Sequence, residues 1–269
     1  MAVVTFLSDY GLGDDFVGVC HGVIAEIAPD VRVIDVTHGI ARHDVREGAI
    51  VLRRALGFMP AGVHLAVVDP GVGSARRAVA LRCAGDGRLL VGPDNGLLWL
   101  AAERCGGVVE AADIGGSPLR PGPVSATFGG RDVFAPVAAH LATGTVTLAQ
   151  AGAPLDPAQL VALELPRAQA TPGGELLAHV LLADGYGNVM LDAQGAVVAA
   201  AGLRRGAAVT VNGRPARYAR TFADVAAGEL IVYEDGYGAL SLAVNGGSAL
   251  ATLGLRRDDE VRIHAGAPS

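Results

Sequence analysis

The hydrophobic and polar positions in the first half of the chain repeat one simple unit. A largely apolar, β-branched run ends abruptly in acidic or small residues, and a helical pattern or a loop follows. Four such runs cover residues 3–7, 31–36, 63–68 and 88–91. Strands that are apolar on both faces are typical of a parallel sheet covered by helices.

Helical patterns cover residues 16–28, 45–56 and 133–142, and each ends shortly before a proline or a glycine. Together with the four apolar runs they predict an α/β layer architecture. In an open sheet of this class, ligands bind in the crevice beyond the carboxyl ends of the strands.

Polar side chains follow three of the predicted strands. Asp9 comes after the first run, Asp69 after the third, and Asp94 and Asn95 after the fourth. Because the carboxyl ends of parallel strands meet at one edge of a sheet, we expect these side chains to point at one place.

The pattern changes after residue 165, where Pro166, Pro172 and two glycines indicate a linker. Downstream, short strands flank the turns 184–188, 212–213 and 235–238, as in hairpins. The sequence therefore predicts two domains. An N-terminal parallel-sheet α/β domain covers residues 1–165, and a small C-terminal antiparallel β-barrel domain covers residues 172–266.

Composition narrows the range of functions. No apolar run approaches the roughly 20 residues of a membrane span, and the first residues lack a basic leader, so we expect a soluble, cytoplasmic protein without a membrane partner. The formal net charge of −6 argues against nucleic-acid binding. All 21 basic side chains are arginine, which excludes mechanisms that need a lysine amine.

Cysteine and histidine spacing gives little support for a metal, a disulfide or a covalent intermediate. Cys20, Cys83 and Cys105 are widely separated and are expected to be buried free thiols. His38 and His43 lie near Asp35 and Asp44, but a third metal ligand is not evident from the spacing, and His21 and His64 are expected to be structural. We expect no metal and no cofactor.

The segment 67–77, VVDPGVGSARR, carries the most chemistry. A strand ends in the Asp69 carboxylate, and a glycine-rich turn leads to Arg76 and Arg77. Its glycine spacing differs from that of dinucleotide-binding loops. The spacing alone also allows an ordinary β-turn with a surface ion pair.

Two further segments stand at strand or helix ends. Asp9 in LSDYG follows the strand directly and is the better ligand candidate, because a carboxylate there could accept both hydroxyls of a ribose, whereas Asp14 and Asp15 are expected to cap the following helix. The glycines and backbone N–H groups of TFGGRD, residues 127–132, could face an anionic or polar ligand group, but on these residues alone an ordinary helix start is the favoured interpretation.

Taken together, these motifs resemble the S-adenosyl-L-methionine (SAM) hydroxide adenosyltransferases, which are related to the SAM-dependent fluorinase and chlorinase. The segments that carry the resemblance run through the whole chain in order: LSDYG, DVTHGI, VVDPGVG with Arg76, GPDNGLL, TFGGRDVFAP, DGYGN and DGYGALSLAVN. The resemblance implies an α/β domain, a C-terminal barrel and a homotrimer with active sites between neighbouring subunits.

The resemblance also implies a reaction, in which water or hydroxide attacks ribose C5′ of SAM and methionine leaves. Asp69 and Arg76 match the family's catalytic aspartate and arginine, and Arg77 is an alternative to Arg76. The halogenases have a tyrosine where Asp69 stands. A carboxylate repels halide but orients water, so Asp69 favours hydrolysis.

The chain departs from the family where TFHGRD reads TFGGRD, so Gly129 replaces the family's catalytic histidine. His43 is one candidate substitute, since it resembles a substrate-contacting position of the halogenases. In the last motif, Asp235-Gly236 stands where the family often has Asn-Ser, before Tyr237.

The substrate-binding residues that the resemblance implies come from both domains. They are Asp9, Tyr10, His43, Asp94, Asn95, Thr127, Phe128, Gly129, Asp184, Tyr186, Asn188 and Tyr237. Two other functions stay open: a 5′-halogenase that uses the space at Gly129, and a protein that binds SAM or adenosine after losing efficient catalysis.

Overall fold

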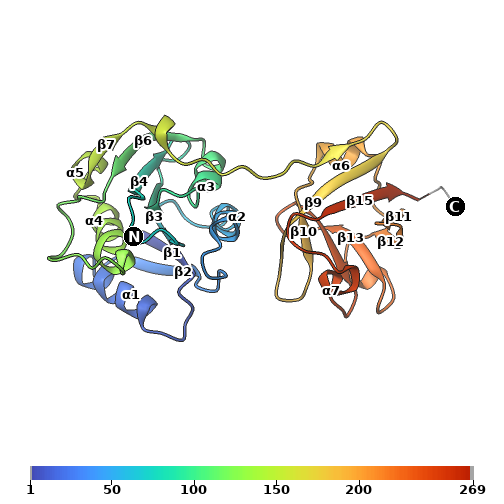
Figure 1. Cartoon of the computed structure of the whole chain (residues 1–269), viewed down its shortest axis with the longest axis horizontal. Coiled ribbons are helices and arrows are strands. Elements are labelled where there is room, and N and C mark those ends of the chain that lie inside the picture. Colours follow the sequence, from blue (N-terminus) through green and yellow to red (C-terminus); the bar gives the residue numbers. More distant parts are fainter. Residues whose placement is uncertain (1, 267–269) are drawn as a thin grey trace. The chain divides into compact units, whose positions relative to one another are not determined.

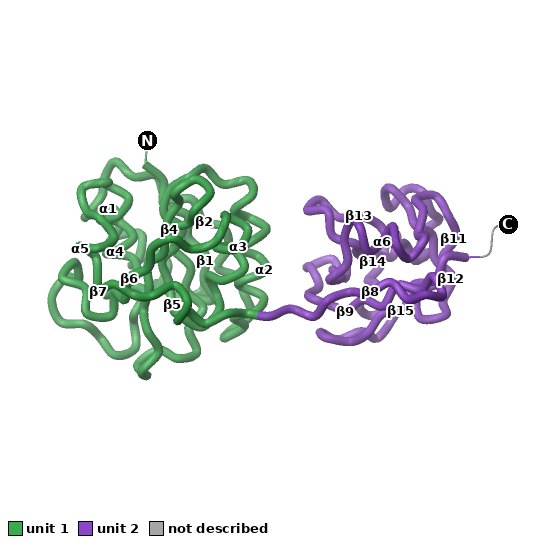
Figure 2. The backbone as a smooth tube through the Cα atoms, turned by 90° about the horizontal axis from the view of Figure 1, so that it is seen from above, with its two compact units in different colours: residues 1–163 green, residues 164–269 purple. Residues whose placement is uncertain are grey.

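The computed structural model describes residues 2–266, and the chain folds as two compact units (Figure 2). The first unit ends at Leu163 and the second begins at Glu164. The linker predicted between residues 165 and 172 contains the short strand β8, Gln169–Ala170, which pairs within the second unit. Within the described residues, no helix is both long and apolar enough to cross a membrane.

The first unit is built on a seven-stranded sheet with the order β2-β1-β3-β5-β4-β6-β7 (Figure 1). Its strands are β1 Val3–Ser8, β2 Arg32–Thr37, β3 Val63–Val67, β4 Ala78–Cys83, β5 Leu89–Pro93, β6 Val108–Asp113 and β7 Ala153–Leu155. The four predicted runs are β1, β2, β3 and β5, and they pair in parallel as expected. The other three strands pair antiparallel, so the whole sheet is mixed.

Helices cover both faces of this sheet (Figure 1). They are α1 Phe16–Ile27, α2 Val45–Ala55, α3 Trp99–Arg104, α4 Ala135–Ala142 and α5 Leu148–Ala151. Phe6 packs in the core with α1 and α4, and its neighbour Leu7 packs in the core with α2 and α3. Both side chains are fully buried, and such burial contributes about 1.5–3 kcal/mol for each.

The predicted third helix has an irregular start. Gly130–Phe134 form one π-helical turn, which runs directly into α4. π-Helical turns inside α-helices are frequent at functional sites, and this one begins at the second glycine of the TFGG segment.

The second unit is a barrel closed by the pairing of β9 with β10. Its remaining elements are β9 Glu175–Ala183, β10 Val189–Leu191, β11 Ala208–Val211, β12 Arg214–Tyr218, β13 Leu230–Glu234, β14 Leu240–Val244, β15 Glu260–Ala265, α6 Ala196–Ala200 and α7 Ala249–Leu253. Its pairs are antiparallel as predicted, except β12 with β13, which are parallel. Asn212 and Gly213 both have positive φ, which explains the tight β11–β12 hairpin.

Candidate active site

The predicted crevice lies where β1 and β3 end side by side. These strands are parallel neighbours with Ser8 opposite Val67, and the Asp9 N–H donates to the Val67 carbonyl at 3.3 Å. A cavity of about 400 Å³ opens there. It is lined by Asp9, Tyr10, Asp14, Phe16, Arg42, His43, Val67, Asp69, Val72, Thr127, Phe128, Gly129 and Gly130.

Asp69 is held in this cavity by Arg76. The Arg76 Nε donates to Asp69 Oδ1 at 3.0 Å, and Nη2 donates to Oδ2. Both side chains are largely buried, with 6% of Asp69 and 15% of Arg76 exposed. Burial raises the pKa of the Asp69 carboxyl above its ordinary value, while the Arg76 guanidinium and a backbone N–H oppose that rise. Arg76 is itself fixed by the Arg77 carbonyl and lies over the Phe134 ring.

The glycine-rich turn returns the chain so that Arg76 meets Asp69. The Ser74 hydroxyl and N–H both donate to the Gly71 carbonyl, which closes the turn. Gly73 has a φ of 79°, and a Cβ there would approach the Ala126 carbonyl oxygen to 2.9 Å. Glycine is therefore required at this position by both conformation and space.

Arg77 pairs with a different carboxylate, that of Asp94. Its Nε donates to Asp94 Oδ2 at 2.8 Å, and the Val161 N–H donates to Asp94 Oδ1 at 2.9 Å. Asn95 is also engaged internally, because its Nδ2 donates to the Val68 carbonyl. The cavity lining does not include Asp94 or Asn95, although both follow β5 as expected. The antiparallel strand β4 is the reason, since it places Arg77 opposite Asp94.

His43 joins the cavity through an unusual backbone conformation. Its φ is 65°, and its N–H donates to Asp9 Oδ2 at 2.9 Å. This hydrogen bond orients the Asp9 carboxylate. The next residue, Asp44, caps α2 by accepting from the Glu47 N–H at 2.9 Å.

Aromatic rings form one wall of the cavity. Tyr10 and Phe16 each pack against Phe128, with ring centroids 6.1 and 5.1 Å apart. Burial raises the pKa of Tyr10, so its phenol stays protonated. A Cβ at Gly130 would collide with the Tyr10 hydroxyl, which explains the glycine.

Gly129 lies in the same cavity lining with ordinary helical dihedrals, φ −55° and ψ −30°. A Cβ there would lie 3.3 Å from Phe134 Cε2, and Phe134 is the ring beneath Arg76. The backbone therefore accepts a side chain at this position, and the Phe134 ring has to yield only slightly.

The other predicted residues belong to the second unit. The Asp184 carboxylate accepts from the N–H groups of Tyr186 and Asn188, and the Asp235 carboxylate accepts from the Tyr237 N–H. Both tyrosines are exposed, Tyr186 to 84% and Tyr237 to 49%. Because β10 and β14 are antiparallel, the turns that precede them lie at opposite ends of this strand pair.

Several cavity residues were missed by reasoning from the sequence. Asp14 was expected to cap a helix but lines the cavity, and Asp15 occupies the cap position without a side-chain capping bond. Phe16 was read only as a helical residue. Arg42 sits beside His43, and this adjacency was the one available signal.

Comparisons with known proteins show the family of the chain. The model of the SAM hydroxide adenosyltransferase N-terminal domain matches residues 4–152, and that of the C-terminal domain matches residues 178–262. The chain is 51% identical to a protein of Salinispora tropica named (R)-S-adenosyl-L-methionine hydrolase, over 98% of each chain. A fluorinase of Actinopolyspora mzabensis is 29% identical over 97% of this chain and 96% of its own.

A solved structure has the same fold. It is the crystal structure of an uncharacterized conserved protein from Thermotoga maritima, with a TM-score of 0.88 and 36% identity. The similarity covers 97% of this chain and 99% of that one. With both domain models matched in order along the chain, this protein belongs to the SAM hydroxide adenosyltransferase family.

Proposed function

We propose that this chain hydrolyses SAM to adenosine and L-methionine. The observation that carries the proposal is the Asp69 carboxylate, fixed by Arg76 in the cavity of a chain that belongs to this family. Water attacks ribose C5′, and the C5′–sulfur bond breaks with its electron pair going to sulfur. The attacking water releases one proton, so one SAM cation and one water give adenosine, methionine and a proton.

Asp69 and Arg76 hold the nucleophile in this proposal. The sulfonium is already an excellent leaving group, so the protein has to place a partly desolvated water in line with the C5′–sulfur bond. The carboxylate accepts a hydrogen bond from that water, and burial makes it a stronger proton acceptor than an exposed aspartate. The same charge repels halide, which favours hydrolysis over halogenation.

The remaining cavity residues bind the nucleoside. Asp9, oriented by the His43 N–H, accepts ribose hydroxyls. Tyr10, Phe16 and Phe128 supply an apolar wall for the purine and ribose faces. Thr127 and Gly129 line the same cavity and contact the substrate in this proposal. The reaction needs no electron transfer and no activation of the leaving group, so no resident cofactor is invoked.

We further propose a homotrimer in which a neighbouring copy completes each site. Phe16 and Val72, both lining the cavity, are each 40% exposed, which leaves apolar surface for a partner to cover. Asp184, Tyr186, Asn188 and Tyr237 would contact methionine and adenine from the barrel of that neighbour. The three free cysteines fit the reducing cytoplasm as the place of action.

The shared site has its own test. Asp69→Ala and Tyr186→Ala subunits, each of which we expect to be inactive alone, are mixed after unfolding, and light scattering measures the mass of the refolded particle. Recovered activity in a particle of three chains would support the proposal. A monomer, or no recovery from a mixed trimer, would contradict it.

Product analysis tests the reaction itself. Purified protein is incubated with SAM in ¹⁸O-labelled water, with and without chloride, and the products are identified by mass spectrometry. We expect adenosine that carries ¹⁸O in its 5′-hydroxyl, together with unlabelled methionine, in both cases. A 5′-chloro product would assign the chain to halogenation, and intact SAM bound without turnover would assign it to binding alone.

A further inference from the structure

Three side chains with metal-binding atoms converge outside the cavity lining, at the edge of the sheet beneath α1. They are His21 on α1, Asp35 on β2 and His38 just after β2. One ligand atom from each lies within 4.8 Å of the other two. His21 Nε2 is 2.9 Å from Asp35 Oδ1, and His38 Nε2 is 3.1 Å from the same oxygen.

The buried member of this cluster, His38, has a ring nitrogen without a hydrogen-bond partner in the described part of the chain. His38 is only 5% exposed, and its Nε2 has no hydrogen-bond partner among residues 2–266. It lies close to Asp35 Oδ1 but without hydrogen-bond geometry. A buried polar atom without a partner is costly, and this one lies 3.1 Å from Asp35 Oδ1 and within 4.8 Å of the His21 ligand atom.

The opposite ring nitrogen of His38 is already fixed. His38 Nδ1 lies 2.7 Å from Ser8 Oγ, which also accepts from the Tyr10 N–H at 3.3 Å. When Nδ1–H donates to Ser8, Nε2 is an unprotonated acceptor that lies 3.1 Å from a carboxylate oxygen. A cation between the two acceptors removes this conflict, and a hydrogen-bonded second nitrogen is the usual arrangement for a metal-ligating histidine.

We propose that His21, Asp35 and His38 form a binding site for one divalent transition-metal ion of the zinc class. Two imidazole nitrogens and one carboxylate oxygen suit Zn²⁺ or Co²⁺ better than Mg²⁺ or Ca²⁺. Ligand atoms at the corners of a zinc tetrahedron are roughly 3.3 Å apart, given zinc–ligand distances of about 2.0–2.1 Å. The two distances to Asp35 Oδ1, 2.9 and 3.1 Å, are close to that value, and the two histidine nitrogens lie within 4.8 Å of each other.

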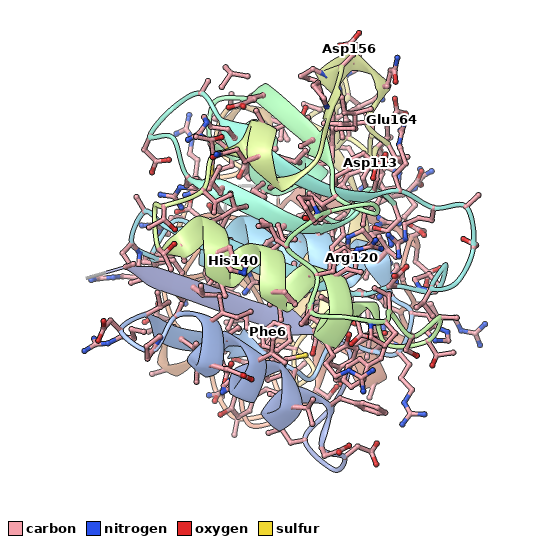
Figure 3. All side chains as sticks on the ribbon, turned by 90° about the vertical axis from the view of Figure 1, so that its left-hand side faces the viewer. Phe6, Asp113, Arg120, His140, Asp156 and Glu164 are labelled. Atoms are coloured by element: carbon pink, nitrogen blue, oxygen red, sulfur yellow. The ribbon has the colours of Figure 1, made fainter. Side chains whose placement is uncertain are left out.

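The cluster is open to solvent on one side, and its two imidazoles are held in place by packing. The side chains of His21 and Asp35 are 36% and 42% exposed, so an ion can enter from solvent and keep water on its open side. The Phe6 ring, labelled in Figure 3, packs against the imidazoles of His38 and His21 and limits their rotation.

The site is coupled to the substrate cavity through the backbone. The Gly11 N–H donates to the His38 carbonyl at 2.8 Å, and Ser8 precedes Asp9 and Tyr10. A bound ion therefore steadies the loop that carries two cavity residues, at a distance from the reacting atoms. The spacing along the sequence concealed the site, because α1 alone brings His21 to the other two ligands.

The test measures binding directly, in chelator-treated protein without a histidine tag. Co²⁺ is titrated while its visible absorption is recorded, and Zn²⁺ is then added as a competitor. We expect one ion per chain, with an absorption typical of four-coordinate Co²⁺. His21→Gln and Asp35→Asn should each weaken binding by about tenfold or more.

His140→Gln is the matched control, because His140 is another half-exposed helical histidine, on α4 (Figure 3). It should bind Co²⁺ as the wild type does. Circular dichroism confirms that each variant is folded, and His21 is chosen over buried His38 for this reason. Absence of stoichiometric uptake by the wild type, or unchanged affinity in His21→Gln, would overturn the proposal.

Discussion

Asp69 and Arg76 form a two-point ion pair across a glycine-rich turn, with Nε donating to Oδ1 at 3.0 Å and Nη2 donating to Oδ2. The pair fixes the direction of a carboxylate that is 6% exposed and whose pKa is raised by burial. A buried carboxylate with one strong partner has a defined orientation and retains proton affinity, as the holder of a nucleophilic water requires.

Asp69→Ala should lower turnover far more than substrate binding. The side chain acts on the water in the proposed reaction, so we expect kcat to fall by about 10²–10⁴-fold while the Kd for SAM changes only slightly. Single-turnover kinetics and calorimetric SAM binding separate the two quantities. Full turnover in the folded variant would remove Asp69 from the mechanism.

The rate should depend on pH through the Asp69 carboxyl. Its pKa lies above the ordinary value of 3.8 because burial outweighs the effect of Arg76. The ionised form is the active one, so kcat/KM should rise with pH. It should reach its plateau at a higher pH than it would if the catalytic carboxyl were that of an exposed aspartate. A rate profile in buffers of constant ionic strength measures this, and an acid limb that persists unchanged in Asp69→Asn would argue against the assignment.

Gly129→His should fold and gain an ionisation. The backbone at 129 is helical, and the new Cβ meets only the edge of the Phe134 ring at 3.3 Å. An imidazole there supplies a proton acceptor with an ordinary pKa of about 6.5, so we expect a higher kcat with an inflection near that value. Gly129→Ala is the control for bulk alone. Equal rates in both variants would show that the imidazole adds nothing.

Arg77→Ala should destabilise the first unit without abolishing the chemistry. It leaves the buried Asp94 carboxylate, 4% exposed, without its guanidinium partner, at a cost of about 2–3 kcal/mol. Arg82→Ala is the control, since the side chains of the Arg82–Glu110 pair are 37% and 42% exposed and the pair should contribute less than about 1 kcal/mol. Urea unfolding measures both, and equal losses would contradict the distinction.

His64 should make the fold sensitive to acid. It is fully buried beside Thr5, and burial followed by the nearby Arg88 charge lowers its pKa from 6.5 to about 4. Above pH 6.5 the ring is neutral in both states and the stability is fully present. Between pH 6.5 and 4 the unfolded chain takes up the proton first, so stability falls as pH falls, by up to about 3 kcal/mol.

The measurement for His64 is the free energy of unfolding in urea at several pH values. His64→Leu, which cannot titrate, should show a smaller loss across this range. A pH dependence identical to that of the wild type would assign the acid sensitivity to other groups.

The sequence by itself determined the architecture and much of the crevice. Apolar runs with the strand period specified β1, β2, β3 and β5, and their parallel pairing followed because both faces had to be buried. Asp9 and Asp69 were placed together for the same reason, since the ends of neighbouring parallel strands meet. These features depend on local periodicity and on a general rule of sheet packing.

Only the tertiary structure decided which arginine meets which carboxylate. Because β4 returns antiparallel to β5, Arg76 pairs with Asp69 and Arg77 pairs with Asp94. As a result, Asp94 is not part of the cavity lining. The convergence of His21 with Asp35 and His38 likewise depends on how α1 packs on the sheet. Such contacts join residues far apart in the chain, and local sequence periodicity does not specify which distant residues pack together.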